Sequence, residues 1–112
     1  MKKKYIPQRG DLVWLNFNPQ SGHKQSGRRP ALVLTLVEYN EKVGLALFCP
    51  VTSQIKGYPF EVLLPEKLPI AGVILSDQIK NLDWRVREAT FIAKLPDKQV
   101  NEVLSKIAVL LS

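Results

Sequence analysis

The residues best suited to chemistry lie in one polar stretch and at the end of one apolar run. Residues 18–29, Asn-Pro-Gln-Ser-Gly-His-Lys-Gln-Ser-Gly-Arg-Arg, hold two glycines, one histidine, three fixed cations and no acid. The apolar run 44–51 leads into Thr52 and Ser53. A long loop in a small domain is usually functional or disordered, and strand-like sequence on both sides of this one favours function. The composition of the loop suits a site that holds and cuts a phosphodiester.

Cleavage of RNA without a metal needs three kinds of group. The ribose 2′-hydroxyl must lose a proton to attack the adjacent phosphorus, charge growing on the phosphoryl oxygens must be stabilised, and the leaving 5′-oxygen must gain a proton. Histidine titrates near neutrality, so His23 is the candidate for proton transfer. The loop arginines can supply fixed charge, and Thr52 can donate a hydrogen bond.

Strand-like runs separated by turn signals fill most of the chain before residue 96. Strands are expected at 12–17, 31–37, 45–51, 60–64, 72–76 and 88–95, with a hairpin or short helical turn at 39–44. After residue 96 the spacing of the apolar residues becomes that of a helix, and Asp97, which follows Pro96, is a candidate N-cap. The helical stripe consists of Val100, Val103, Leu104, Ile107, Leu110 and Leu111. Short strands followed by one helix predict a mainly β fold, a compact barrel with a docked C-terminal helix.

Composition narrows the class of protein. A chain of 112 residues is expected to form one domain, 1–112, and its net charge of +6 favours a polyanionic partner such as nucleic acid, an anionic membrane surface or an acidic protein segment. The single cysteine, Cys49, excludes an internal disulfide, and one His with one Cys argues against a zinc site. The basic N-terminus lacks a following apolar segment and no run reaches membrane-spanning length, so a cytoplasmic location is expected.

Motifs along almost the whole chain match one known family in order. They are Gly10-Asp-Leu-Val-Trp14, Phe17-Asn-Pro19, Gly22-His-Lys-Gln25, Gly27-Arg-Arg-Pro-Ala31, Pro50-Val-Thr-Ser53, Lys56-Gly-Tyr-Pro-Phe-Glu61, Gly72-Val73, Ser76-Asp-Gln78 and Trp84-Arg-Val-Arg87. This ordered set resembles the MazF/PemK (Kid) family of toxin endoribonucleases, the mRNA interferases of type II toxin–antitoxin modules. The match to the MazF branch is close.

The resemblance implies a fold, an activity and partners. The fold would be an SH3-like barrel, the CcdB/MazF-like toxin fold, in a homodimer. The activity would be ribosome-independent and metal-independent cleavage of single-stranded mRNA at short sequence motifs, leaving 2′,3′-cyclic phosphate and 5′-hydroxyl ends, without a cofactor. A cognate antitoxin would cover the site with an acidic, largely disordered C-terminal segment, which agrees with the basic charge of the chain.

Site residues are carried over from the family one by one. The essential arginine falls on Arg29, the essential hydroxyl on Thr52 and the histidine of some members on His23, so these three are predicted to be catalytic. Arginine stays protonated at neutral pH, so Arg29 is expected to hold phosphoryl oxygens and not to act as a base. The predicted RNA-binding residues are Lys24, Gln25, Arg28, Ser53, Lys56, Asp77, Gln78, Arg85 and Arg87.

Some roles stay open at this point. His23 could transfer a proton or only line the loop, and Asp77 could be a structural acceptor. Trp14 is expected in the core, while Trp84 with its neighbouring arginines could grip RNA or pack a rim. The family commonly has Glu where this chain has Lys24, and some members have Arg where it has Leu75. Two rival functions remain, a CcdB-like toxin that poisons gyrase by binding and an inactive RNA-binding module.

Overall fold

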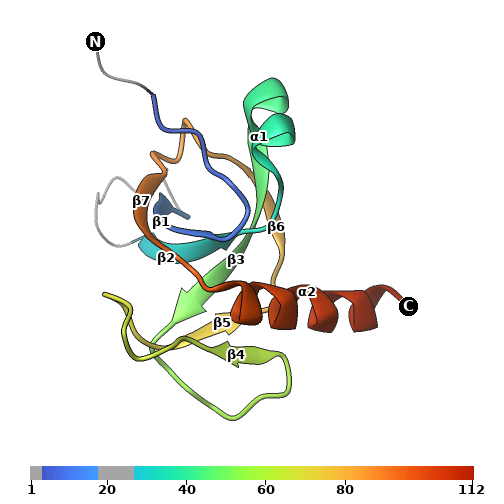
Figure 1. Ribbon diagram of the computed structural model, residues 1–112. Coiled ribbons are helices and arrows are strands. Elements are labelled where there is room, and N and C mark those ends of the chain that lie inside the picture. Colours follow the sequence, from blue (N-terminus) through green and yellow to red (C-terminus); the bar gives the residue numbers. More distant parts are fainter. Residues whose placement is uncertain (1–3, 18–26) are drawn as a thin grey trace.

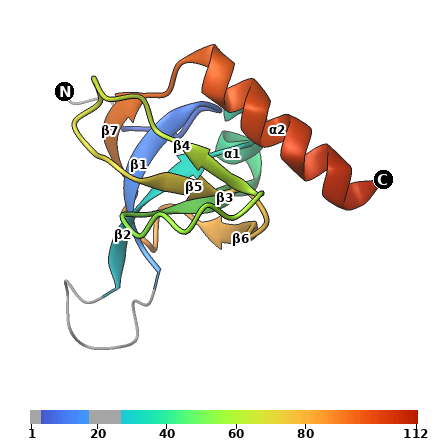
Figure 2. The same ribbon diagram turned by 90° about the horizontal axis from the view of Figure 1, so that it is seen from below.

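The strands of this protein form one antiparallel sheet that curls on itself. The computed structural model describes residues 4–17 and 27–112. Within them the strand order is β4-β5-β3-β2-β1-β7, and β6 pairs with β3 beside this path (Figures 1 and 2). The strands are β1 Asp11–Asn16, β2 Arg28–Val33, β3 Leu45–Thr52, β4 Glu61–Leu63, β5 Val73–Leu75, β6 Lys80–Asp83 and β7 Thr90–Lys94. The helices are α1 Val37–Val43 and α2 Asp97–Leu111.

Strand β3 causes the curl because it changes partners along its length. Its first half pairs with β6, its middle pairs with β2 through residues 48–50, and its last two residues pair with β5. A strand shared in this way joins two differently oriented halves of a sheet. The predicted mainly β fold with a C-terminal helix, an SH3-like barrel, is confirmed. Thr52 lies where β3 has left β2 and pairs with β5.

Two apolar clusters fill the two sides of the curled sheet. Leu12 on β1 lies in the cluster beneath α2, whereas Val13 and Leu15 lie in the cluster with Phe48 and Trp84. Alternating residues of a strand face opposite sides, so β1 contributes to both clusters. Neither of the described helices is long and apolar enough to span a membrane.

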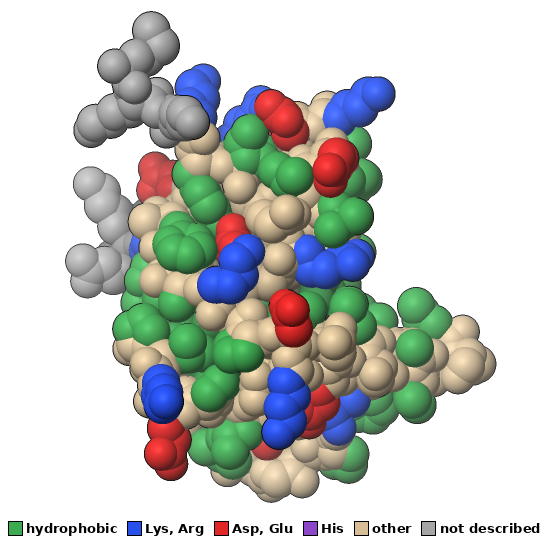
Figure 3. All heavy atoms as spheres, in the orientation of Figure 1, with side chains coloured by type: hydrophobic (Ala, Val, Ile, Leu, Met, Phe, Trp, Pro, Cys, Tyr) green, Lys and Arg blue, Asp and Glu red, His purple; other side chains and the backbone are tan. Residues whose placement is uncertain are grey.

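The C-terminal helix is docked along most of its length. Val100, Val103 and Ile107 are buried, as the helical spacing predicted. The last turn instead projects from the body of the molecule, with the Leu111 side chain 80% exposed (Figure 3). The predicted N-cap was wrong, because Pro96 occupies the N-cap position and makes no side-chain capping hydrogen bond.

Two elements differ from the sequence prediction. The strand expected at 31–37 begins earlier, at Arg28, and ends at Val33, because a hydrogen-bond network turns the chain into α1. In this network the buried Asn40 side chain donates to the carbonyl oxygens of Pro7 and Thr35 and accepts from the Thr35 hydroxyl. The sequence analysis did not predict β6, because its residues Lys-Asn-Leu-Asp lack an apolar alternation.

Candidate active site

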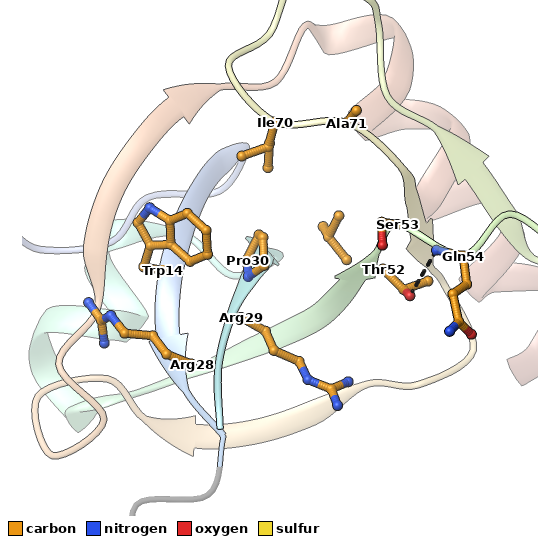
Figure 4. Close-up of a pocket in the computed structure, with 10 residues that line it drawn as sticks. Trp14, Arg28, Arg29, Pro30, Thr52, Ser53, Gln54, Ile70 and Ala71 are labelled. Atoms are coloured by element: carbon orange, nitrogen blue, oxygen red, sulfur yellow. Dashed lines mark hydrogen bonds between the residues drawn. The ribbon is translucent and has the colours of Figure 1, made fainter. Parts of the chain in front are cut away.

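Arg29 and Thr52 meet in space although they are distant in sequence. The β2–β3 pairing ends with Ala31 opposite Pro50, so Arg29 and Thr52 each lie two residues beyond the last pair. Both residues line two adjacent hollows, each of about 520 Å³, at this end of the sheet. Figure 4 shows the first hollow, with Arg29 on β2 and Thr52 at the end of β3. The two residues that the family resemblance marks as essential therefore share one concave site.

The first hollow combines apolar and polar lining residues. Its apolar lining residues are Trp14, Pro30, Val51, Ile70 and Ala71. Figure 4 shows Trp14 across the hollow from Thr52. Trp14 is on the same face of β1 as Leu12 but beyond the edge of the core, so its side chain is 38% exposed. The expectation that Trp14 belongs to the core is therefore wrong. An aromatic ring in an open hollow is suited to stacking on a base.

The second hollow has charged and amide side chains in its lining and contains the predicted Asp-Gln pair. Its lining residues beyond Arg29 and Thr52 are Gln54, Lys56, Tyr58, Glu61, Leu75, Asp77 and Gln78. The Tyr58 hydroxyl donates to Asp77 Oδ2 at 2.7 Å, and this bond, together with the charge of Asp77, raises the pKa of Tyr58. Asp77 Oδ1 is buried without a hydrogen-bond partner among the described residues. Asp77 is thus oriented by Tyr58 at the rim of this hollow.

Glu61 shapes the loop between β3 and β4. Its carboxylate accepts hydrogen bonds from the backbone amides of Lys56 and Gly57 at 3.0 to 3.3 Å. These bonds fold the loop back, so that Lys56 and Tyr58 face the second hollow. A carboxylate engaged in this way has a structural role in the loop.

The Thr52 hydroxyl is arranged to donate. Its Oγ1 accepts the amide hydrogen of Gln54 at 3.2 Å, which leaves the hydroxyl hydrogen for another acceptor. Gly72 packs against the backbone of Thr52 from the start of β5. Arg29 and Thr52 therefore offer a charged donor and a neutral donor to an anionic ligand that lies where the two hollows meet.

The other predicted site residues are distributed unevenly. Ser53 lines the first hollow. Arg28 lines it too, but its guanidinium group points away from Arg29 (Figure 4). Arg85 and Arg87 lie in the β6–β7 connection and line neither hollow; Arg85 stacks over the Trp84 ring at 4.9 Å. His23, Lys24 and Gln25 lie outside the described residues.

Trp84 is a core residue and offers no face to RNA within this chain. Its side chain is only 6% exposed, and its indole Nε1 donates to the backbone oxygen of Asn40 at 2.9 Å. Trp84 thereby ties the β6–β7 connection to α1. Of the two alternatives considered for Trp84 from the sequence, the structure agrees with packing.

Sequence reasoning missed several residues that line the site. They are Trp14, Gln54, Tyr58, Glu61, Ile70 and Ala71. Three of them lie in matched motifs that could have identified them: Trp14 ends the motif Gly10-Asp-Leu-Val-Trp14, and Tyr58 and Glu61 lie in Lys56-Gly-Tyr-Pro-Phe-Glu61. Within residues 4–17 and 27–112, no three His, Cys, Asp or Glu side chains come together as a metal-binding group.

Comparison with known proteins places this chain in one family. Residues 8–111 match the family described as PemK-like, MazF-like toxin of type II toxin-antitoxin system. The chain therefore belongs to the PemK-like, MazF-like toxin family of type II toxin–antitoxin systems, and it is an enzyme of the endoribonuclease class that characterises its relatives.

Particular relatives cover nearly the whole chain. The endoribonuclease toxin MazF of Escherichia coli K12 is 43% identical over 111 residues, 99% of each chain. The endoribonuclease toxin ChpB of the same strain is 35% identical over 113 residues, 96% of each chain. A crystal structure of MazF from Deinococcus radiodurans has 54% identity and a TM-score of 0.88, covering 96% of this chain and 98% of that one. A MazE–MazF structure from that organism has 49% identity and a TM-score of 0.87, over 97% and 98% of the two chains.

Proposed function

We propose that this chain is the toxin of a type II module and cuts single-stranded mRNA at short sequence motifs, independently of the ribosome and of metal ions. The observation that carries the proposal is the shared position of Arg29 and Thr52 between two hollows. A phosphate seated between them has room for one nucleotide on each side. Neither residue is a base, so the proposed site stabilises charge, and proton transfer requires another group.

The reaction balances with the ribose as its own nucleophile. The 2′-oxygen loses its proton to a base and forms a bond to phosphorus, and the bond from phosphorus to the 5′-oxygen breaks. The leaving 5′-oxygen takes a proton, so the products carry a 2′,3′-cyclic phosphate and a 5′-hydroxyl. Arg29 neutralises the charge that grows on the phosphoryl oxygens, Thr52 donates a hydrogen bond there, and His23 transfers the proton.

The two hollows support binding of the bases that flank the cut. Trp14 offers a stacking surface in the first hollow. Asp77 and Gln78 offer an acceptor and an amide to base edges in the second hollow. Lys56 and Ser53, with Lys24 and Gln25 from the polar loop, would contact the strand next to the cut, and Arg85 would contact it farther along.

The proposed partners follow from charge and from the relatives. One structural relative is a MazE–MazF complex, and a net charge of +6 favours an acidic antitoxin segment that competes with RNA for this face. We propose that the toxin is a cytoplasmic homodimer and that it uses no cofactor. A CcdB-like gyrase-binding toxin and an inactive RNA-binding module are disfavoured, because neither function requires Arg29 and Thr52 to lie together in one concave site.

One assay separates these functions. The purified full chain is incubated with a long single-stranded RNA in EDTA, and the cut ends are mapped. We expect cuts at one short motif, with 2′,3′-cyclic phosphate and 5′-hydroxyl ends. All-DNA substrate and RNA carrying a 2′-O-methyl group at the cut site should resist. Complete loss of cleavage in EDTA, or cleavage of DNA, would contradict the mechanism, and no cleavage of any RNA would favour a binding-only protein.

A further inference from the structure

The described residues on the two sides of residues 18–26 are paired with each other at one end of the sheet. Asn16 and Arg28 form the last pair of the β1–β2 register. One further hydrogen bond, from the Phe17 amide to the Gly27 carbonyl oxygen at 2.8 Å, closes the described part of this ladder. Anything that fixes residues 16, 17, 27 and 28 therefore fixes the base from which the segment with His23, Lys24 and Gln25 departs.

The Arg28 side chain extends from β2 across β1 to residues around the start of β7. Its Nη1 donates to Asn16 Oδ1 at 2.8 Å. Its Nη2 donates to the backbone oxygen of Glu88 at 3.0 Å and to Thr90 Oγ1 at 2.8 Å. Since β1 lies between β2 and β7 in the sheet, these bonds connect three strands that are neighbours in the sheet, although β7 is far from the other two in sequence.

Arg87 holds the end of β1 from the opposite direction. Its Nη1 donates to the backbone oxygens of Asn16 at 3.3 Å and Phe17 at 2.7 Å. Its own backbone oxygen accepts the Asn16 amide hydrogen at 2.9 Å. Side chain and backbone of one residue thus enclose the last two described residues before the segment.

The residue between these partners has a strained backbone. Glu88 has a φ of 55°, the only positive φ among the described non-glycine residues. Its backbone oxygen accepts from Arg28 and from the Thr90 hydroxyl, and its carboxylate accepts from Asn16 Nδ2. Such a conformation persists only where its surroundings determine it, and it is common near functional sites.

We infer that Arg28 and Arg87 are positioning residues, which fix both ends of the 18–26 segment to the β6–β7 connection, and that neither is a phosphate ligand. The inference rests on the proposed ribonuclease function and revises the expectation that both arginines bind RNA. Their planar guanidinium groups suit the task, because each spans several acceptors that a lysine ammonium cannot reach together.

The first test separates position from charge by binding. The parent and the variants Arg28→Gln, Arg87→Gln and Arg29→Gln bind an uncleavable 2′-O-methyl RNA over a range of salt concentrations. Each phosphate contact on a single strand contributes a slope of about −0.7 to log K against log salt. We expect Arg28→Gln and Arg87→Gln to keep the slope of the parent and Arg29→Gln to reduce it. A reduction by about 0.7 in either of the first two would overturn the inference.

The second test uses the conservative variant and the rate constants. Arg28→Lys keeps the positive charge but loses the planar guanidinium group, which donates hydrogen bonds from two nitrogens. It should therefore behave like Arg28→Gln, with kcat lowered roughly 10- to 100-fold and KM changed much less. Restoration of parental kcat by lysine would show that charge alone matters and would overturn the inference. Thr90→Val removes one acceptor of the Arg28 side chain and changes no charge, so it should lower kcat several-fold. An unchanged kcat in this variant would count against the inference. This comparison remains valid if Arg87→Gln fails to fold.

The third test needs no activity. Amide hydrogen exchange of Asn16 and Phe17 should accelerate in Arg28→Gln and Arg87→Gln, while the amides of β3 keep their protection. Arg85→Gln removes a cation from the same connection and should leave the exchange of both amides unchanged. Unchanged exchange in the first two variants would refute the positioning role. Absence of RNA cleavage by the parent would refute only the proposed function.

Discussion

Neighbouring arginines in this protein have different surroundings because a strand alternates its sides. Arg28 and Arg29 are consecutive on β2, and their guanidinium groups point in opposite directions (Figure 4). Arg29 is exposed and faces both hollows, whereas Arg28 is half-buried and hydrogen-bonded to three acceptors. Two adjacent residues of the same type are therefore proposed to have different roles: Arg29 stabilises charge, and Arg28 positions the chain.

Replacement of the two facing donors should affect the rate unequally. Loss of one preorganised donor typically lowers the rate by about 10²–10³, and because Arg29 is charged, Arg29→Ala should exceed that range. Thr52→Ala removes a neutral donor and should lower the rate less. Single-turnover cleavage of a short RNA measures both. A folded Arg29→Ala protein with the cleavage rate of the parent would remove the central residue of the proposed mechanism.

His23→Ala distinguishes proton transfer from a passive role. If His23 transfers a proton, the rate should fall by roughly 10²–10⁴ and the acidic limb of the pH–rate profile should flatten. We expect this outcome, because histidine is protonated and deprotonated most easily near neutral pH. A loss of only a few-fold, with the shape of the profile unchanged, would assign proton transfer to another group.

Stability should fall at alkaline pH because of Cys49. Burial, and secondarily the charge of Asp77, raises the pKa of the Cys49 thiol from 9.0 to about 12. Below pH 9 the thiol is protonated in both states, but above it the unfolded chain loses a proton that the native chain keeps. The free energy of unfolding should then decrease by about 1.4 kcal/mol per pH unit until the native pKa is reached.

The variant Cys49→Ala isolates this contribution. The pKa of Tyr5 and that of Tyr58 are also raised in the native state, so both tyrosines contribute to the loss of stability, but they do so equally in the parent and the variant. The difference between the two proteins between pH 9 and pH 10 therefore reports the thiol. Urea unfolding should show a smaller loss of stability in the variant than in the parent across this interval. Equal losses would mean that the thiol does not keep its proton in the native state.

At the scale of elements, the start of β5 controls the position of Thr52. Gly72 has a φ of 128°, and a Cβ built there would lie 2.1 Å from the backbone oxygen of Thr52. Gly72→Ala must therefore displace the end of β3, and the backbone conformation adds about 1–3 kcal/mol of strain. We expect lower thermal stability and a cleavage rate reduced even at temperatures where the variant is folded.

Gly44→Ala is the matched control for this effect. Gly44 also has a positive φ, 81°, but a Cβ there would meet no atom within 4 Å. This variant should lose stability through strain alone, about 1–2 kcal/mol, and keep its cleavage rate. Loss of activity in both variants would mean that general destabilisation, not the contact with Thr52, explains the result.

The elements also show what the sequence could and could not predict. The strong periodicities of β1, β3 and α2 were sufficient to place them. The sequence analysis missed β6 because pairing with β3 determines it, not its own polar residues. It placed Trp14 in the core and left Trp84 undecided, because their burial depends on where the sheet curls. Arg29 and Thr52 were found by family resemblance, whereas the bonds of Arg28 and Arg87 depend on residues about 60 to 70 positions away.

At the scale of the whole molecule, apolar surface remains after the chain has folded. A domain of 112 residues buries a limited share of its surface. The last turn of α2 leaves Val109, Leu110 and Leu111 exposed by 65%, 43% and 80%. Strands β4 and β7 end the sheet path, and among the described residues their outer edges are unpaired. Such features are commonly covered by a second subunit.

We therefore expect a homodimer in solution. Light scattering at micromolar concentration should give twice the 12.7 kDa mass of one chain, and serial dilution should shift the mass towards the monomer only near the dissociation constant. Thermal stability should also rise with protein concentration, because a dimer that unfolds to monomers is stabilised by mass action. A monomeric mass at micromolar concentration, with full cleavage activity and a concentration-independent Tm, would show that one chain is the complete enzyme.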